Sequence, residues 1–126
     1  MLPKSIKIGT QIWEVSEQKR KHNSDFHEGT YGYTIDKDNT IVLDVEMPVS
    51  RKRTTLLHEL LHAIRFTYGG VTTPSKSSNF ADWEHYFIGL YEEPLITVLQ
   101  ENPDLADFLL GKGNENNNNR TAKADN

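Results

Sequence analysis

The sequence predicts a small α+β domain in which an N-terminal antiparallel β-meander of three or four strands packs on one long helix and on a second, antiparallel helix. Three observations support this fold class. Short runs of β-branched and aromatic residues precede residue 46, two runs of helical period follow, and a connection rich in Ser and Thr separates those two runs. A chain of 126 residues has room for one core, so residues 1–111 are expected to form a single domain.

The N-terminal part is expected to contain a short hairpin or a bent strand, followed by an antiparallel hairpin. Residues 5–16 are rich in apolar β-formers, and Gly9 with Thr10 offers a turn or a bulge in their middle. Residues 31–35 alternate in size, and residues 40–45 are the strongest strand signal in the chain. A polar turn separates these last two segments, which predicts an antiparallel hairpin.

The segment between the hairpins, residues 17–30, is polar and charged, with Phe26 as its only large apolar side chain. Such a segment predicts a mobile surface loop. It carries His22 and His27, and histidines in polar loops are usually solvated.

The first long helix is expected over residues 50–68, because no Gly or Pro interrupts this run. Ser50 is a plausible N-cap, and Gly69 with Gly70 is a plausible stop. The expected apolar stripe has helical period and consists of Leu57, Leu60, Leu61 and Ile64.

The second helix is expected to start near Asn79 or Asp82 and to end at Glu101. Pro94 lies inside this run and should kink the helix or divide it. The apolar stripe of the second helix consists of Ile88, Tyr91, Leu95 and Val98. Glu84 precedes these residues at the same helical spacing.

The chain is expected to end with a short helix and a polar tail. Asn102 and Pro103 offer an N-cap and a first residue for a helix that runs through Leu110. Residues 112–126 contain no large apolar residue, so this tail is expected to be disordered.

The most informative motif is His58-Glu59-Leu60-Leu61-His62, which has the HExxH pattern. On a helix, positions four residues apart lie on one face, so His58 and His62 can present ring nitrogens to one metal ion. Glu59 is then placed to take a proton from a water molecule rather than to bind the metal. The alternative is a surface helix whose two histidines simply face water.

A catalytic zinc ion needs three protein ligands, so one ligand must come from outside the motif. Glu84 is the favoured candidate, because 22 residues after His62 leave enough chain for an antiparallel return. His85 is the alternative third ligand, and Glu92, Glu93 or a loop group remain open. Without a metal, Glu84 is a helix-start acid favoured by the macrodipole and His85 an exposed imidazole.

If one zinc ion binds, Glu59 can act as the general base for water attack on a carbonyl group, which implies amide hydrolysis. His85, Tyr68 and Tyr91 are candidates for stabilising the oxyanion.

The composition disfavours several classes of partner and site. A net charge of -4 argues against nucleic-acid binding, and the basic runs at residues 19–21 and 51–53 are expected to be solvated. The absence of cysteine leaves no disulfide or thiolate site and suits a reducing cytoplasm. Neither a signal peptide nor a membrane span is expected.

The chain resembles a family of small phage and prophage proteins with a zincin-like core, built from a β-hairpin or meander, an HExxH helix and a second helix that ends in Asn-Pro. The similarity covers residues 6 to about 110. It rests on the segments IKIG, IDKDNTIVLDVEM, LLHELLHAIRF, DWEHYFIGL and LQENPDL. More distantly, the chain resembles peptidases encoded beside repressors on mobile elements and proteases of DNA–protein crosslinks.

The resemblance implies zinc at His58 and His62, Glu59 as general base, a third ligand near DWEH, and a place in the cytoplasm of a host bacterial cell. His85 directly after Glu84 departs from the plainly glutamate-bearing second helix of the family, so the identity of the third ligand stays open.

Two functions follow from these expectations. The first is a zinc-dependent metallopeptidase that hydrolyses a protein substrate. The second is a non-catalytic zinc-binding module that engages a protein partner and uses the metal to hold two helices together. Neither nucleic acid nor a membrane is an expected partner.

Overall fold

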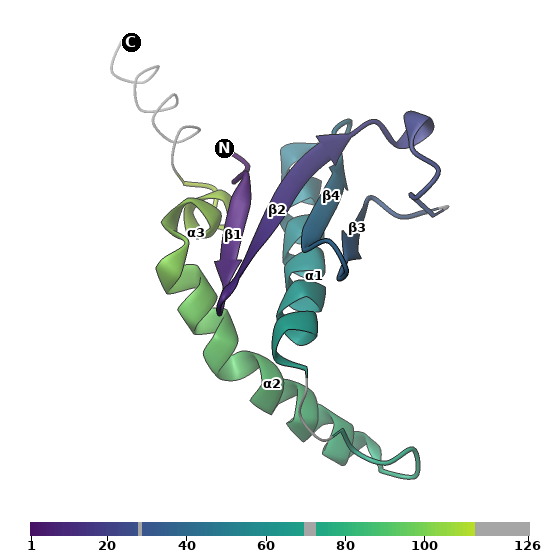
Figure 1. Ribbon diagram of the computed structural model, residues 1–126, viewed down its shortest axis with the longest axis vertical. Coiled ribbons are helices and arrows are strands. Elements are labelled where there is room, and N and C mark those ends of the chain that lie inside the picture. The colour runs from purple at the N-terminus through teal and green to yellow at the C-terminus, as the bar shows by residue number, and fades with distance from the viewer. Residues whose placement is uncertain (28, 70–72, 113–126) are drawn as a thin grey trace.

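The structure of the protein, a computed structural model, describes residues 1–27, 29–69 and 73–112. Its elements in chain order are β1 (Ser5–Ile8), β2 (Gln11–Gln18), the 3-10 turn η1 (Arg20–His22), β3 (Gly32–Ile35), β4 (Thr40–Asp44), α1 (Val49–Tyr68), α2 (Phe80–Glu101) and α3 (Pro103–Leu109). A four-stranded sheet followed by helices confirms the expected α+β class (Figure 1). Most of the tail that we expected to be disordered, residues 113–126, lies outside the described residues. None of the described helices is long and apolar enough to cross a membrane.

The sheet is mixed, and the expected meander is only partly present. Its strand order is β1-β2-β4-β3. Strands β3 and β4 form the expected antiparallel hairpin, and β1 and β2 form a hairpin rather than one bent strand. However, β2 pairs with β4 in parallel. The central position of β4 has a physical reason, because its apolar run of Ile41, Val42 and Leu43 is buried on both faces. The half-buried strand β3 is left at the edge of the sheet.

Helix α1 covers one face of the sheet (Figure 1). Its buried apolar side chains are Leu56, Leu60, Ala63 and Ile64, which join the strand residues in one core. The expected stripe was therefore partly wrong, since Leu57 is 39% exposed and Leu56 takes its place. The face of α1 that packs on the sheet is therefore rotated relative to the expected stripe. This rotation puts Glu59 on the buried side of the helix.

Helix α2 begins at Asn79 through a capping box, as one of the two expected starts. The Asn79 side chain accepts a hydrogen bond from the Asp82 backbone N–H, and the Asp82 carboxylate accepts one from the Asn79 backbone N–H. The helix continues through Pro94 as one element, so the expected division does not occur.

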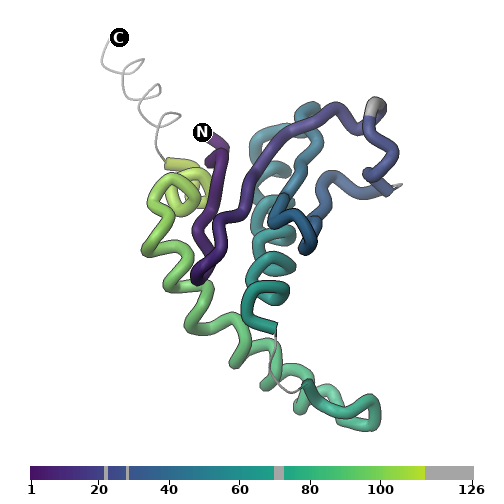
Figure 2. Tube along the Cα trace, in the orientation of Figure 1, coloured from purple at the N-terminus to yellow at the C-terminus, as the bar shows by residue number. Residues whose placement is uncertain are grey.

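The two halves of α2 lie in different surroundings. From Leu90 onward the helix packs on the core through Tyr91, Leu95 and Val98. Residues 80–89 extend past the C-terminal end of α1 and include no buried residue (Figure 2). The expected apolar stripe of α2 is therefore buried only in its second half.

Asn102 ties the end of α2 to the outer edge of β1. Its side-chain oxygen accepts a hydrogen bond from the Lys7 N–H at 2.8 Å, and its side-chain nitrogen donates to the Lys7 carbonyl at 2.8 Å. Pro103 then begins α3, as expected. The Asn-Pro pair thus closes one edge of the sheet and starts the last helix.

Candidate metal centre

Helix α1 brings the three motif side chains together. The ligand atoms of His58, Glu59 and His62 all lie within 4.8 Å of one another. This grouping follows from local geometry, because an i, i+4 pair on a helix shares one face. The two imidazoles are exposed, whereas Glu59 is only 5% exposed.

The separation of the two imidazoles fits a tetrahedral metal ion. The Nε2 atoms of His58 and His62 are 3.3 Å apart. Two bonds of about 2.0–2.1 Å that meet at a tetrahedral angle would place the nitrogens about 3.3–3.4 Å apart. At the same separation, one ring can donate a hydrogen bond to the other, with donor and acceptor set by the tautomers.

Glu59 is held by the neighbouring strand. The hydroxyl of Thr34 on β3 lies 3.2 Å from Glu59 Oε1 and 3.3 Å from the Glu59 backbone carbonyl, and it donates toward both. A buried carboxylate that accepts such a bond has a restricted orientation. Glu59 is therefore positioned beside the imidazole pair with little freedom to turn away.

A groove of about 590 Å³ runs between α1 and β3 and contains the motif. Consecutive residues from Tyr31 to Thr34 line it on the β3 side. Because side chains alternate between the two faces of a strand, this continuous lining means that the groove follows the edge of β3. Gly32 allows the close approach of the helix, since an added Cβ would lie 2.9 Å from Thr55 Cγ2.

Several contacts connect the described residues of the loop before β3 to the strands. Phe26 is buried and packs edge-on against Tyr33, with ring centroids 5.0 Å apart. The side chain of Asn23 donates a hydrogen bond to the Tyr33 hydroxyl at 2.8 Å and also contacts Gln18. These contacts bring His27 to the wall of the same groove.

The two basic runs meet at the other side of this loop. The guanidinium groups of Arg20 and Arg51 lie 5.7 and 5.0 Å from the centre of the Tyr31 ring. Lys52 forms an ion pair with Glu17 at 2.8 Å. These charges are therefore engaged in holding the loop and the start of α1, in addition to facing solvent.

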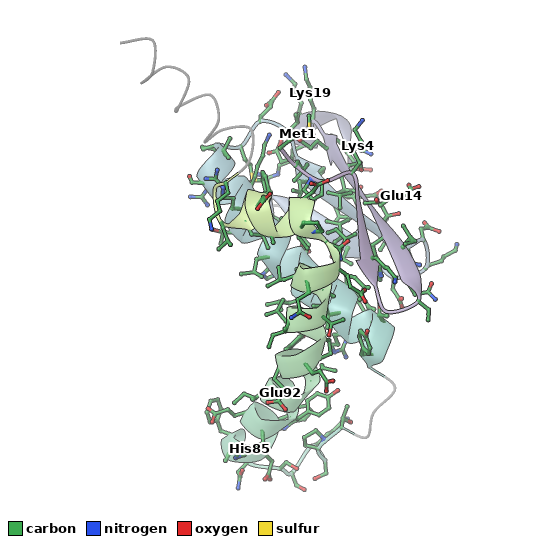
Figure 3. All side chains as sticks on the ribbon, turned by 90° about the vertical axis from the view of Figure 1, so that its left-hand side faces the viewer. Met1, Lys4, Glu14, Lys19, His85 and Glu92 are labelled. Carbon is green, nitrogen blue, oxygen red and sulfur yellow. The ribbon has the colours of Figure 1, made fainter. Side chains whose placement is uncertain are left out.

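The residues expected to supply the third ligand are not brought to this centre. Glu84 and His85 are exposed on the first half of α2 and lie outside the group formed by the motif. Figure 3 shows His85 and Glu92 at the end of the molecule that projects away from the sheet. The antiparallel return assumed for α2 occurs only from Leu90 onward, so residues 80–89 pass beyond α1.

The expected oxyanion groups lie apart from the groove as well. Tyr68 and Tyr91 pack on the core, and neither lines the groove. Burial raises the pKa of Tyr91 above its usual value of 10.0, although the charge of Arg65 opposes this shift. Tyr91 therefore stays neutral near pH 7.

Three residues of the site were missed from the sequence. Thr34 orients Glu59, Gly32 allows the close packing of β3 on α1, and Phe66 stacks on His62 with ring centroids 6.3 Å apart. The sequence signal for these β3 contacts was the alternation of Gly32 and Thr34 with Tyr31, Tyr33 and Ile35. It places small side chains on one face of the strand, where a helix can pack closely.

Comparisons with known proteins do not extend this picture, since no family model, curated protein or solved structure matches the chain.

Proposed function

We propose that the protein is a zinc-dependent hydrolase of peptide bonds, with His58 and His62 as metal ligands and Glu59 as general base. The observation that carries the proposal is the geometry of the motif. The Nε2 atoms of His58 and His62 have the separation expected around a tetrahedral metal ion, and the buried Glu59 carboxylate is held beside them. Three imidazole or carboxylate groups with an open position are the usual donor set of hydrolytic zinc.

Zinc held by this pair would polarise the scissile carbonyl group and lower the pKa of a nearby water molecule. Glu59 would accept the proton of the attacking water at a carboxylate oxygen and then deliver it to the leaving amine. The hydroxyl of Thr34 keeps the carboxylate aimed at the groove during both transfers. Burial of Glu59 between α1 and β3 limits competition from bulk water.

The geometry of β3 supports an extended polypeptide as the substrate. The Tyr31 carbonyl accepts a hydrogen bond from the Asp44 N–H at 2.8 Å. In an antiparallel pair, every second residue bonds to the neighbouring strand, so Gly32 and Thr34 do not bond to their β4 partners, Leu43 and Ile41. The backbone groups of Gly32 and Thr34 therefore point away from β4, toward the groove. A peptide strand can add to such an edge through main-chain hydrogen bonds and lie beside the motif.

At the opposite edge of the sheet, the outward backbone groups of Lys7 in β1 are already bonded within the protein. There, the Asn102 side chain occupies the backbone donor and acceptor of Lys7. The protein thus closes the β1 edge with its own side chain, while the β3 edge borders the groove.

The alternative is a non-catalytic zinc-binding module that engages a protein partner. The exposed aromatic residues on the first half of α2, such as Phe80 at 79%, favour a partner surface. However, all three members of the motif group belong to α1. A metal bound there would not hold α1 and α2 together, so the arrangement supports the hydrolase more strongly.

The resemblance to small phage and prophage proteins extends the proposal to the protein's origin and to a cytoplasmic site of action in a bacterial host. These two points rest on the segments that carry the resemblance.

The direct test uses the zinc-loaded full chain and a diverse library of extended peptides, with new termini detected by mass spectrometry. We expect cleavage by the unmodified protein and a fall of about 10²- to 10⁴-fold in Glu59→Gln at unchanged zinc content. Glu92→Gln, on the exposed face of α2, is the matched control and should retain full cleavage. Zinc binding without Glu59-dependent cleavage would refute the hydrolase.

A further inference from the structure

We infer that His27, in the loop before β3, supplies the third metal ligand of this centre. The inference rests on the proposed zinc site and adds to it a residue from outside helix α1. It replaces Glu84 and His85, which the fold leaves on the exposed first half of α2.

The chemistry of the groove leaves few other donors. Among the described residues that line it, imidazole and carboxylate groups belong only to His27, His58, Glu59 and His62. Glu59 is engaged by the Thr34 hydroxyl and serves as the base. His27 is therefore the remaining side chain of a type that zinc commonly binds.

The backbone of His27 is fixed at the groove wall. Its carbonyl accepts hydrogen bonds from the Thr30 backbone N–H at 3.1 Å, the Thr30 hydroxyl at 2.7 Å and the Arg20 guanidinium at 3.3 Å. Gly29, with φ at 81°, allows the tight turn that makes these bonds. Buried Phe26 anchors the preceding position.

The side chain of His27 is free to move, in contrast to its backbone. It is exposed, and within the described part of the chain its imidazole makes no hydrogen bond, ion pair or ring contact. It does not belong to the group whose ligand atoms lie within 4.8 Å of one another. Closure of this one side chain onto the His58 and His62 pair is the movement that the inference requires.

A metal on that pair would favour this closure. His58 and His62 would hold the ion through their Nε2 atoms, on the side of α1 that lines the groove. A third imidazole would complete three protein ligands and leave the fourth position open, as in catalytic zinc sites. The anchored turn limits the entropy lost when the imidazole binds.

The test measures zinc affinity by competition with a chromophoric chelator, using full-length His27→Ala. We expect at least about a 100-fold loss of affinity, which is the upper end of the loss caused by removing a residue that only supports a ligand. His85→Ala and Glu84→Gln are the controls and should bind zinc as the unmodified protein does. Thermal unfolding of the zinc-free proteins should show no difference, because His27 is exposed.

X-ray absorption of the zinc-loaded proteins gives a readout independent of affinity. We expect three imidazoles around zinc in the unmodified protein and two in His27→Ala. Full affinity and an unchanged imidazole count in His27→Ala would overturn the assignment while leaving the His58 and His62 site intact. A loss of affinity in Glu84→Gln or His85→Ala instead would assign the ligand to α2. An unmodified protein that binds no zinc would refute the proposed function together with this inference.

Discussion

Two helical segments of the protein carry adjacent histidine and glutamate residues, and they present them in opposite ways. In α1, Glu59 is 5% exposed and is held by β3 beside the paired imidazoles. In the first half of α2, Glu84 and His85 are exposed on a segment that no other element covers within the described structure (Figure 1). Both segments carry a histidine next to a glutamate, and they differ in their support.

This difference lies in how the surrounding elements support each segment. In α1, helix geometry alone places His58 and His62 on one face, and Thr34 of β3 then holds Glu59. The α2 pair would need the whole helix to lie along α1, and only its second half does so. Support from neighbouring elements therefore distinguishes the candidate centre from the exposed pair.

The largest expected effect is on zinc affinity, which should depend on the histidines of α1 and not on Glu84 or His85 of α2. His58→Ala should lower zinc affinity at least about 100-fold, because it removes one of the two proposed ligands of α1. Glu84→Gln should leave affinity unchanged, because Glu84 lies outside the motif group. Competition titrations with a chelator measure both. Equal losses in the two variants would remove the distinction between the segments.

The next effect separates the two halves of α2 by their contribution to stability. Leu90→Ala should lower the free energy of unfolding by about 2–5 kcal/mol, since this side chain is only 7% exposed. Phe80→Ala should change it by no more than about 0.5 kcal/mol, since Phe80 is 79% exposed. Urea unfolding of the zinc-free chain measures both. A large loss in Phe80→Ala would mean that the first half of α2 is packed in solution.

A smaller effect tests the support that β3 gives to Glu59. Thr34→Val keeps the shape of the side chain but removes the hydroxyl that donates to the buried carboxylate. We expect a loss of about 1–2 kcal/mol in the free energy of unfolding. Thr54→Val is the control, because among the described residues its hydroxyl donates only to the Ser50 carbonyl, on an exposed part of α1. Comparable losses in both variants would argue against a special role for Thr34.

The smallest effect concerns Tyr91, where α2 begins to pack on the core. Because burial raises the pKa of Tyr91 in the folded state, its neutral form stabilises the fold below the unfolded-state value of about 10. This contribution should be lost as pH rises through the folded-state pKa. Urea midpoints of Tyr91→Phe should therefore fall less above pH 10 than those of the unmodified protein. An identical decline in the two proteins would contradict this pH dependence.

The sequence was most informative where structure is local. The helical run of α1, the Asn79 start of α2, the turn at Gly9 and the role of Pro103 all depend on neighbouring residues, and all were found. The expected cap at Ser50 was wrong, because α1 already begins at Val49 after Pro48. The parallel pairing of β2 with β4 depends on residues far apart in the chain, so it was missed.

The candidate site divides in the same way. His58, Glu59 and His62 follow from one helical turn, and the structure brings them together as expected. The Thr34 contact requires β3 to lie against α1, and the place of Glu84 requires the path of α2 after a connection that includes Pro74. Hydrophobic periodicity cannot determine either arrangement, because it does not say which segments meet.

The most direct test follows all five histidine side chains of the unmodified protein by ¹H–¹⁵N NMR during titration with zinc. Our account predicts that the ring nitrogens of His58 and His62 shift together and saturate at one zinc ion per chain, while those of His85 stay unchanged. Shifts at His85 that saturate with the metal, or no saturable shift at His58 and His62, would contradict it.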